Sequence, residues 1–333
     1  MSSHIKKEKK IVVLVLYFGK LPNHFQLWLD SCAYNNKIDF LIFTDDKTKF
    51  IYPINVSVKY CSFIWLKNLI QKKYHFKINL NTPYKLCDFR PAYGDIFSEY
   101  LKEYDYWGYC DLDMIFGDLY LFLEKAISES YDKIMMLGHL SLYKNIDEIN
   151  TMYKKINSNY INYKNIFSSA NFFGFDEIAR YGINSILMKN GKKIYHESIY
   201  ADIDETSSRM DLVNYDIEKN KFMKKSQEQI FTFENGKIYS NFYKNNKQFK
   251  KEYLYIHFQK RKMVLNITRG YGKYFISNTA FLPYEIFHVS QIRKYMKKRA
   301  LKDIFKIKRS ALINLLKKES SILIWRIKYI LKI

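Results

Sequence analysis

The chain has 333 residues, of which 48% are hydrophobic and 26% charged, so it can form one large or two small domains with a buried core. The formal net charge is +22, and residues 292–333 supply +12 of it, with 14 Lys or Arg against Asp303 and Glu319. Such a surface favours polyanions: phosphorylated substrates, anionic lipid or nucleic acid. Because the excess lies mainly in the tail, the body lacks the interleaved basic and aromatic pattern of a nucleic-acid-binding protein, and we expect no nucleic-acid partner.

The four cysteines, Cys32, Cys61, Cys87 and Cys110, form no C-x-x-C pair, so we expect free and mostly buried thiols in a reducing compartment. The apolar run 11–18 is only eight residues long and lacks a small-residue cleavage site, which favours a strand over a signal peptide. No stretch approaches the roughly 20 apolar residues that a spanning helix needs. We therefore expect a cytoplasmic protein that lies peripherally on the inner face of the cytoplasmic membrane.

Strands and helices alternate over residues 11–130, which predicts an α/β protein with a mostly parallel central sheet flanked by helices. The run 11–16 is apolar and β-branched, as is typical of a central strand covered on both faces. The elements expected here are strand 11–16, helix 23–33, strand 39–43, strand 55–60, helix 62–74, helix 91–102 and strand 105–110.

The pattern is less regular over residues 131–250. We expect strands at 133–137 and 252–258, helices at 146–157 and 176–190, and basic helices after 285. Neither a linker nor a repeat interrupts the chain. The sequence thus predicts one catalytic domain, 1–290, followed by basic amphipathic helices, 291–333.

Polar clusters follow three of the expected strands, at 17–19, 44–46 and 111–113. In parallel α/β sheets ligands bind beyond the carboxyl ends of the strands, so we expect the three clusters to share one site.

Asp111 and Asp113 are two residues apart, so on an extended segment their side chains point the same way. Hard cations such as Mn²⁺ and Mg²⁺ take oxygen ligands and share them between carboxylates and substrate phosphates. A metal held by this pair would neutralise the diphosphate of a sugar nucleotide. The alternative is a chance D-x-D before a helix capped by Asp118, but the aromatic strand ahead of the pair and Phe116-Gly117-Asp118 behind it favour the metal site.

These segments resemble a bacterial glycosyltransferase family from capsule and lipopolysaccharide gene clusters, of uncharacterised-domain type, with a DXD motif and the Rossmann-like GT-A fold. The resemblance covers about residues 11–265. It rests on residues 17–19, 43–45, 83–94, 107–113, 138–143 and 257–263.

The resemblance implies that Tyr17, Phe18 and Asp45 hold the nucleoside, with Tyr17 stacked on the base. A structural role for Tyr17 as an aromatic residue at the rim is the alternative. It places Lys85 beside the diphosphate and Asp88 beside the ribose or donor sugar. From their spacing alone, Lys85 and Asp88 could equally form a surface ion pair.

Arg90 is a further phosphate candidate, because a guanidinium matches phosphate geometry. The resemblance implies His257 as the third metal ligand, and Lys260 to Lys262 as cations for the leaving diphosphate. A structural role for this lone histidine is the alternative. His139, with Ser141 and Tyr143 on the same strand face, either lines the sugar pocket or forms a solvated strand edge.

An inverting transferase needs a general base, whereas a retaining one does not. Candidate catalytic carboxylates outside the metal pair are Asp176, Glu177 and Asp202, with Asp204 and Glu205 nearby. Asp176 and Glu177 precede an expected helix, so a capping or dipole role is the alternative.

The tail alternates basic and apolar residues at helical spacing, which favours contact with an anionic membrane over packing on the domain. The whole pattern predicts a metal-dependent hexosyltransferase. It would use Mn²⁺ or Mg²⁺ to move sugar from a nucleotide sugar, expected to be a UDP-sugar, to a capsule, O-antigen or lipooligosaccharide acceptor that is a glycan or lipid-linked glycan. A metal-dependent nucleotidyl- or phosphotransferase is the alternative, although no Gly-rich phosphate loop is present.

Overall fold

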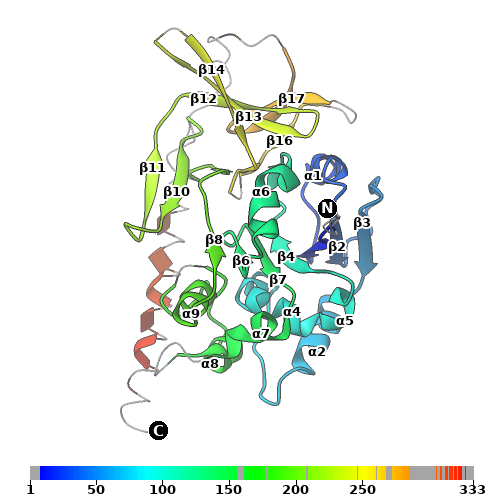
Figure 1. Ribbon diagram of the computed structural model, residues 1–333, viewed down its shortest axis with the longest axis vertical. Helices are drawn as coiled ribbons and strands as arrows, with labels where there is room; N and C mark the ends of the chain where they lie inside the picture. The colour runs from blue at the N-terminus through cyan, green and yellow to red at the C-terminus, as the bar shows by residue number, and fades with distance from the viewer. Residues whose placement is uncertain are drawn as a thin grey trace, which may run out of the picture.

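A seven-stranded sheet forms the centre of the protein, in the strand order β3-β2-β1-β4-β7-β6-β8 (Figure 1). In that order the strands span Val56–Tyr60, Ile38–Thr44, Ile11–Leu16, Tyr106–Cys110, Leu140–Lys144, Lys133–Ile134 and Ile194–Tyr195. The computed structural model describes residues 8–155, 161–177, 179–207, 209–245, 247–259, 261–267, 272–285 and 288, and single positions between 305 and 327.

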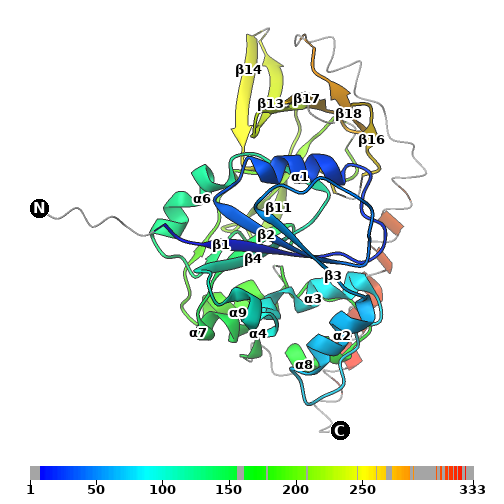
Figure 2. The ribbon, with the colours of Figure 1, turned by 90° about the vertical axis from the view of Figure 1, so that its right-hand side faces the viewer.

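Strand β1 is buried on both faces, as its apolar run predicts. Val13 and Val15 enter one hydrophobic core, whereas Val12 and Leu14 enter the other. Figure 2 shows α1 on one side of the sheet and α2, α3, α4 and α9 on the other. Helices α1 (Phe25–Ala33) and α6 (Leu119–Ser128) complete the first core; the second receives α2 (Phe63–Gln71), α3 (Leu86–Phe89), α4 (Tyr93–Ile96) and α9 (Ile183–Lys189).

The sheet is mixed. Strands β3, β2, β1 and β4 pair in parallel, as do β6 and β8, but β7 runs antiparallel to both β4 and β6. Only residues 135–139 connect β6 to β7, too few for the crossover that a parallel pair requires. The α/β class is confirmed, and the expected parallel arrangement holds for part of the sheet. As an inner strand, β7 buries Ser141 and Tyr143, so it is not a solvated edge.

A second, largely antiparallel sheet lies above the α1 side of the central sheet (Figures 1 and 2). The sequence pattern did not predict it, although Asn235-Gly236 is a hairpin signal, and both residues have the positive φ of a type I′ turn, 48° and 85°. Its order is β14 (Lys247–Tyr253), β13 (Lys237–Lys244), β12 (Gln229–Glu234), β17 (Lys273–Ile276), β18 (Ala280–Pro283), β16 (Val264–Leu265).

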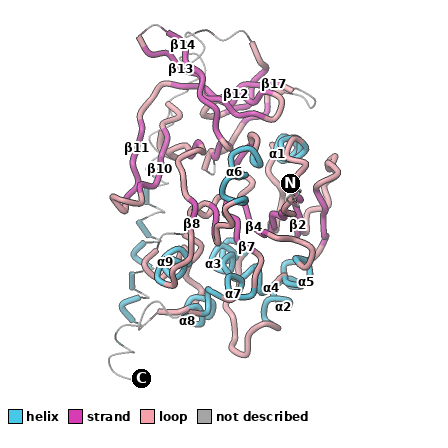
Figure 3. The backbone as a smooth tube through the Cα atoms, in the orientation of Figure 1, coloured by secondary structure: helices cyan, strands magenta, loops and turns pink. Residues whose placement is uncertain are grey.

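Two smaller sheets complete the fold. Figure 3 shows that strands dominate the end of the protein that carries the second sheet, whereas helices dominate the opposite end. One is the hairpin of β10 (Leu212–Asp216) and β11 (Lys221–Lys225). The other places β15 (Tyr255–His257) between β5 (Met114–Phe116) and β9 (Ala201–Asp202). Strand β15 thereby brings residue 257 beside the segment that follows β4.

Several element boundaries differ from expectation. The expected helix 91–102 is interrupted, with α4 followed by α5 (Ser98–Leu101), and the expected helix 176–190 begins only at Ile183. All four cysteines are free, and Cys32 and Cys110 are buried. No described helix is long and apolar enough to cross a bilayer. Most of 291–333 lies outside the described residues, so the expected division at 290 stays a prediction.

Candidate functional site

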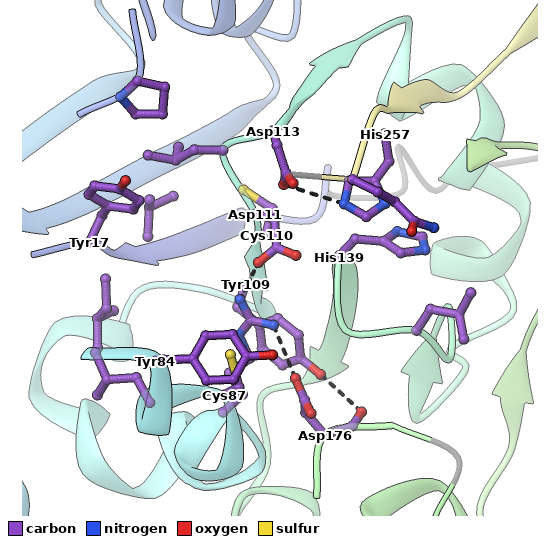
Figure 4. Close-up of a pocket in the computed structure, with 18 of the residues that line it drawn as sticks. Tyr17, Tyr84, Cys87, Tyr109, Cys110, Asp111, Asp113, His139, Asp176 and His257 are labelled. Atoms are coloured by element: carbon purple, nitrogen blue, oxygen red, sulfur yellow. Dashed lines mark hydrogen bonds and ion pairs between the residues drawn. The ribbon is translucent and has the colours of Figure 1, made fainter. Parts of the chain in front are cut away.

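A cavity of about 1060 Å³ opens where β1 and β4 end, and Figure 4 shows side chains from separate elements that surround it. Most of the predicted site residues meet here. Of those residues, the ones that line the cavity are Tyr17, Phe18, Arg90, Asp111, Asp113, His139, Asp176, Glu177, Asp202, Asp204, Glu205, His257 and Lys262.

Asp111, Asp113 and His257 converge on one point. A ligand atom from each lies within 4.8 Å of the other two, and His257 Nε2 is 3.3 Å from Asp113 Oδ1. The backbone sets this geometry: the N–H of Asp111 donates to the His139 carbonyl, and the N–H of Phe258 donates to the Asp113 carbonyl, both at 3.0 Å. Two carboxylates and one imidazole suit Mn²⁺, and Mg²⁺ less well, so these side chains fit a divalent cation.

The second nitrogen of His257 is held by Asp202. Nδ1 lies 2.8 Å from Asp202 Oδ1, and the Gln259 amide donates to the same oxygen at 2.7 Å. Burial lowers the pKa of His257, but the Asp113 and Asp202 carboxylates outweigh burial and hold that pKa well above its usual range. A carboxylate behind a histidine is the usual arrangement that orients a metal-binding imidazole.

His139 lies beside this group, with its ring 4.6 Å from that of His257. The Tyr255 hydroxyl is 2.8 Å from its Nδ1, and its buried Nε2 has no hydrogen-bond partner among the described residues. Burial, and then the His257 charge, lower the pKa of His139 to about 4, so its ring is neutral at pH 7. His139, Asp202 and His257 form a second close group of potential ligands, all buried.

Arg90 connects Asp111, a candidate metal ligand, to the candidate catalytic carboxylates. Its guanidinium pairs with Asp111, lies 3.0 Å from Asp176 Oδ2, and donates to the Gly138 carbonyl at 2.8 Å. The guanidinium also lies over the Tyr109 ring, 5.0 Å from the centroid. Arg90 therefore orients Asp111. Its guanidinium already has three polar partners within the protein, namely Asp111, Asp176 and the Gly138 carbonyl.

Asp176 and Glu177 line the wall beyond Arg90. Burial raises the pKa of Asp176 to about 8 despite the opposing charge of Arg90, and one of its oxygens has no hydrogen-bond partner among the described residues. Burial also raises the pKa of Glu177, which accepts the Gly138 N–H at 3.3 Å. A Cβ on Gly138 would lie 2.8 Å from Glu177 and 2.9 Å from Asp176, so glycine permits this close packing.

Of the three residues predicted to hold the nucleoside, two line the cavity and one does not. Tyr17 lines the cavity, and Phe18 lines it while packing on Phe63 with ring centroids 5.3 Å apart. Asp45 is not among the lining residues of the described chain; it accepts the N–H of Gly19 at 2.7 Å and so fixes the turn after β1. Gly19 has φ of 98°, which a glycine adopts readily.

Lys85 and Asp88 form a buried ion pair of 2.7 Å and do not line the cavity. Lys85 also donates to the carbonyls of Ile166 and Asn171, while Asp88 accepts the N–H groups of Phe173 and Phe175. Burial raises the pKa of Asp88 and lowers that of Lys85, although each partner opposes the other's shift. This pair anchors the loop that precedes Asp176. The contacts that the resemblance implies, of Lys85 with the diphosphate and of Asp88 with the ribose or donor sugar, stay predictions.

The basic triplet is only partly described. Lys260 lies outside the described residues, Lys262 is exposed on the cavity rim, and Arg261 is buried and donates to the carbonyls of Ser207 and Asp204. The Asp204 carboxylate pairs with Lys224 at 2.7 Å. Glu205 lines the cavity.

The sequence reasoning missed several lining residues. Tyr84 and Phe172 form an aromatic pair with centroids 5.0 Å apart, and Phe222 reaches the cavity from β11. Gln259 also lines the cavity and donates a hydrogen bond to Asp202. Tyr84 lay inside the segment that carries the resemblance, whereas no local signal marks Phe222 or Gln259.

A model of a protein family matches residues 13–285, and it is described as a family of unknown function, DUF6625. The chain belongs to this family. No curated protein matches it. Among solved structures, the chain is similar to the galactosyltransferase LgtC in complex with donor and acceptor sugar analogues, with a TM-score of 0.34 and 10% identity over 58% of this chain and 75% of that one. Because DUF6625 has no assigned function and this similarity is low, the site itself has to indicate the chemistry.

Proposed function

We propose that this protein is a metal-dependent glycosyltransferase with a GT-A-like catalytic domain. It would move a sugar from a nucleotide sugar, most simply a UDP-sugar, to a capsule, O-antigen or lipooligosaccharide acceptor. The observation that carries the proposal is the convergence of Asp111, Asp113 and His257 on one cavity at the strand ends. The cavity, at about 1060 Å³, is large enough for a sugar nucleotide and part of an acceptor.

Asp111, Asp113 and His257 would hold Mn²⁺ or Mg²⁺, which supplies charge neutralisation for the leaving diphosphate. Asp202 accepts the Nδ1–H of His257 and so directs Nε2 to the ligand position. We therefore assign Asp202 to positioning. Tyr17 offers a face for the base, and Lys262 offers a positive charge on the rim for the phosphates.

Glu177 is our preferred candidate for contact with the reacting sugar or acceptor hydroxyl. Glu177 lines the cavity, and burial raises the pKa of its carboxyl group, which makes the carboxylate a stronger base. Asp176 is more restricted, because Arg90 holds one of its oxygens.

We propose that the tail brings the enzyme to lipid-linked acceptors on the inner face of the cytoplasmic membrane. Among its described positions, Phe305, Leu312 and Leu316 are exposed, while Ile322 is buried in the second core. Exposed apolar side chains in a basic helix suit an anionic interface.

The test is a screen of nucleotide sugars for release of nucleoside diphosphate with and without Mn²⁺. We expect metal-dependent release of UDP, and loss of metal-dependent UDP binding in Asp113→Ala. Asp147→Ala, which removes an exposed carboxylate at the start of α7 (Asp147–Asn150), is the matched control and should behave as wild type. Release of pyrophosphate instead would indicate a nucleotidyltransferase. UDP binding that ignores both metal and Asp113→Ala would refute the proposal.

A further inference from the structure

The outer faces of β11 and β14 carry lysines separated by exposed apolar side chains. Successive side chains of a strand point to opposite faces, so Lys221, Met223 and Lys225 share one face of β11. On β14 the same alternation gives Lys247, Phe249 and Lys251. We call these six residues the β11–β14 face; Figure 1 shows both strands at the upper left.

Both strands lie at the end of the protein that the second sheet occupies (Figure 1). Burial, and then the positive charge of Lys225, lower the pKa of Lys251. All six residues are exposed, Met223 by 38% and Phe249 by 43%. Phe249 stacks on Phe242 across the hairpin, with centroids 5.6 Å apart, which holds its ring at the surface.

On the opposite face of each strand, a lysine pairs with carboxylates from other segments. Lys224, on the opposite face of β11, pairs with Asp204 and Asp211, and Lys250, on the opposite face of β14, pairs with Glu234. The alternate positions that form the β11–β14 face contain no Asp or Glu. Each strand therefore has one face on which a lysine pairs with carboxylates and another face that carries two lysines, four in all. On that second face of β11, Asp216 of β10 lies opposite Lys221 and pairs with Lys219.

Lysines on edge strands also prevent sheets from associating, and β14 is such an edge. That role does not call for exposed Phe249 and Met223 between the charges. Apolar side chains that are flanked by lysines along a strand match the interface of a bilayer with anionic head groups, where apolar insertion and charge attraction add. A soluble anionic glycan would match the charges alone.

We propose that the β11–β14 face docks on an anionic lipid bilayer. Both strands lie outside the tail segment, 291–333, in the sequence. It lies next to the cavity, because Phe222, on the opposite face of β11, lines the cavity. Docking here would hold one wall of the cavity against the membrane that carries a lipid-linked acceptor, and in that respect the inference extends the proposed function.

The test is binding of the full chain to phosphatidylcholine vesicles with and without phosphatidylglycerol, measured by cosedimentation without nucleotide or metal, so that the outcome does not depend on the transferase assay. The test variant carries Ser at Lys221, Lys225, Lys247 and Lys251. The control carries Ser at four exposed lysines far along the chain, Lys47, Lys49, Lys72 and Lys73. Each lysine at an anionic surface contributes about fivefold, so we expect the test variant to bind at least roughly 100-fold more weakly and the control to change much less.

The double variant Met223→Ser/Phe249→Ser separates insertion from charge attraction; we expect weaker binding with an unchanged dependence on salt. Unfolding midpoints close to wild type would verify that all variants fold. Equal losses in the test and control variants, or no loss in the test variant, would overturn the proposal. So would a test variant that keeps vesicle binding but loses affinity for dextran sulfate, because the face would then bind an anionic glycan.

Discussion

Replacing Asp88 with Ala should destabilise the protein strongly without removing any residue that lines the cavity. The Asp88 carboxylate is fully buried and Lys85 is 3% exposed, so neither charge is screened by water. The substitution leaves the Lys85 ammonium with carbonyl partners only, and the N–H groups of Phe173 and Phe175 lose an acceptor. Removing one member of a buried pair costs roughly 3–5 kcal/mol, and we expect about 4 kcal/mol here.

Urea unfolding monitored by circular dichroism measures this change. Glu99→Ala is the control, because Glu99 pairs with Lys102 at the same i,i+3 spacing but with side chains 77% and 64% exposed. We expect this control to unfold close to wild type, because water and salt screen an exposed ion pair. In Lys85→Met/Asp88→Asn the unpaired buried charge is absent, so this double variant should be more stable than Asp88→Asn alone.

An Asp88→Ala unfolding midpoint no lower than that of Glu99→Ala would refute this reasoning. If Asp88→Ala is also stable but loses affinity for nucleotide, the donor contact implied by the resemblance would be the better account of the pair.

Three further predictions concern other buried groups. Asp202→Asn should weaken Mn²⁺ affinity by roughly 10–100-fold, because Asp202 orients the His257 imidazole. An unchanged affinity in a metal titration would contradict this role. Burial lowers the pKa of Lys133 to about 7, against about 10.4 in the unfolded chain, so the folded state binds fewer protons between these values and its stability rises with pH. Relative to Lys133→Met, wild type should gain roughly 3 kcal/mol between pH 7 and 9.5 in urea unfolding, whereas a constant difference would contradict the low pKa. Gly108→Ala should cost about 1–3 kcal/mol, because its Cβ would lie 2.4 Å from Leu142 and from the Ser141 carbonyl; a midpoint equal to wild type would show that β7 can shift.

Local pattern was sufficient to predict the centre of the fold. The run 11–16 has the composition of a strand covered on both faces, and Ile11–Leu16 is such a strand. The placement of Asp111 beyond β4 followed from the rule for strand ends. His257 was expected at the end of a strand, and it ends β15.

The less local features were not predictable in the same way. Lys85 and Asp88 have the spacing of a surface pair, but they are buried against Ile166 and the loop 171–175, which come from distant parts of the sequence. Arg90 was expected to face a phosphate, but Asp111 and Asp176 converge on it from two other segments. The antiparallel pairing of β7 with β4 likewise joins segments that are distant in the sequence.

The β5–β15–β9 sheet has a consequence for how the protein matures. His257 joins Asp113 across 144 positions of sequence, and its supporting Asp202 comes from a third segment. Contacts of such separation close late in folding, because the chain entropy of a long loop is lost before the contact is made. On the ribosome, a nascent chain that ends before residue 257 would have both carboxylates of the proposed metal site but lack the imidazole. Tight metal uptake at the proposed site should therefore begin only after nearly all of the expected catalytic domain, 1–290, has been synthesised. The bound metal would then link an early segment of the chain to a late one.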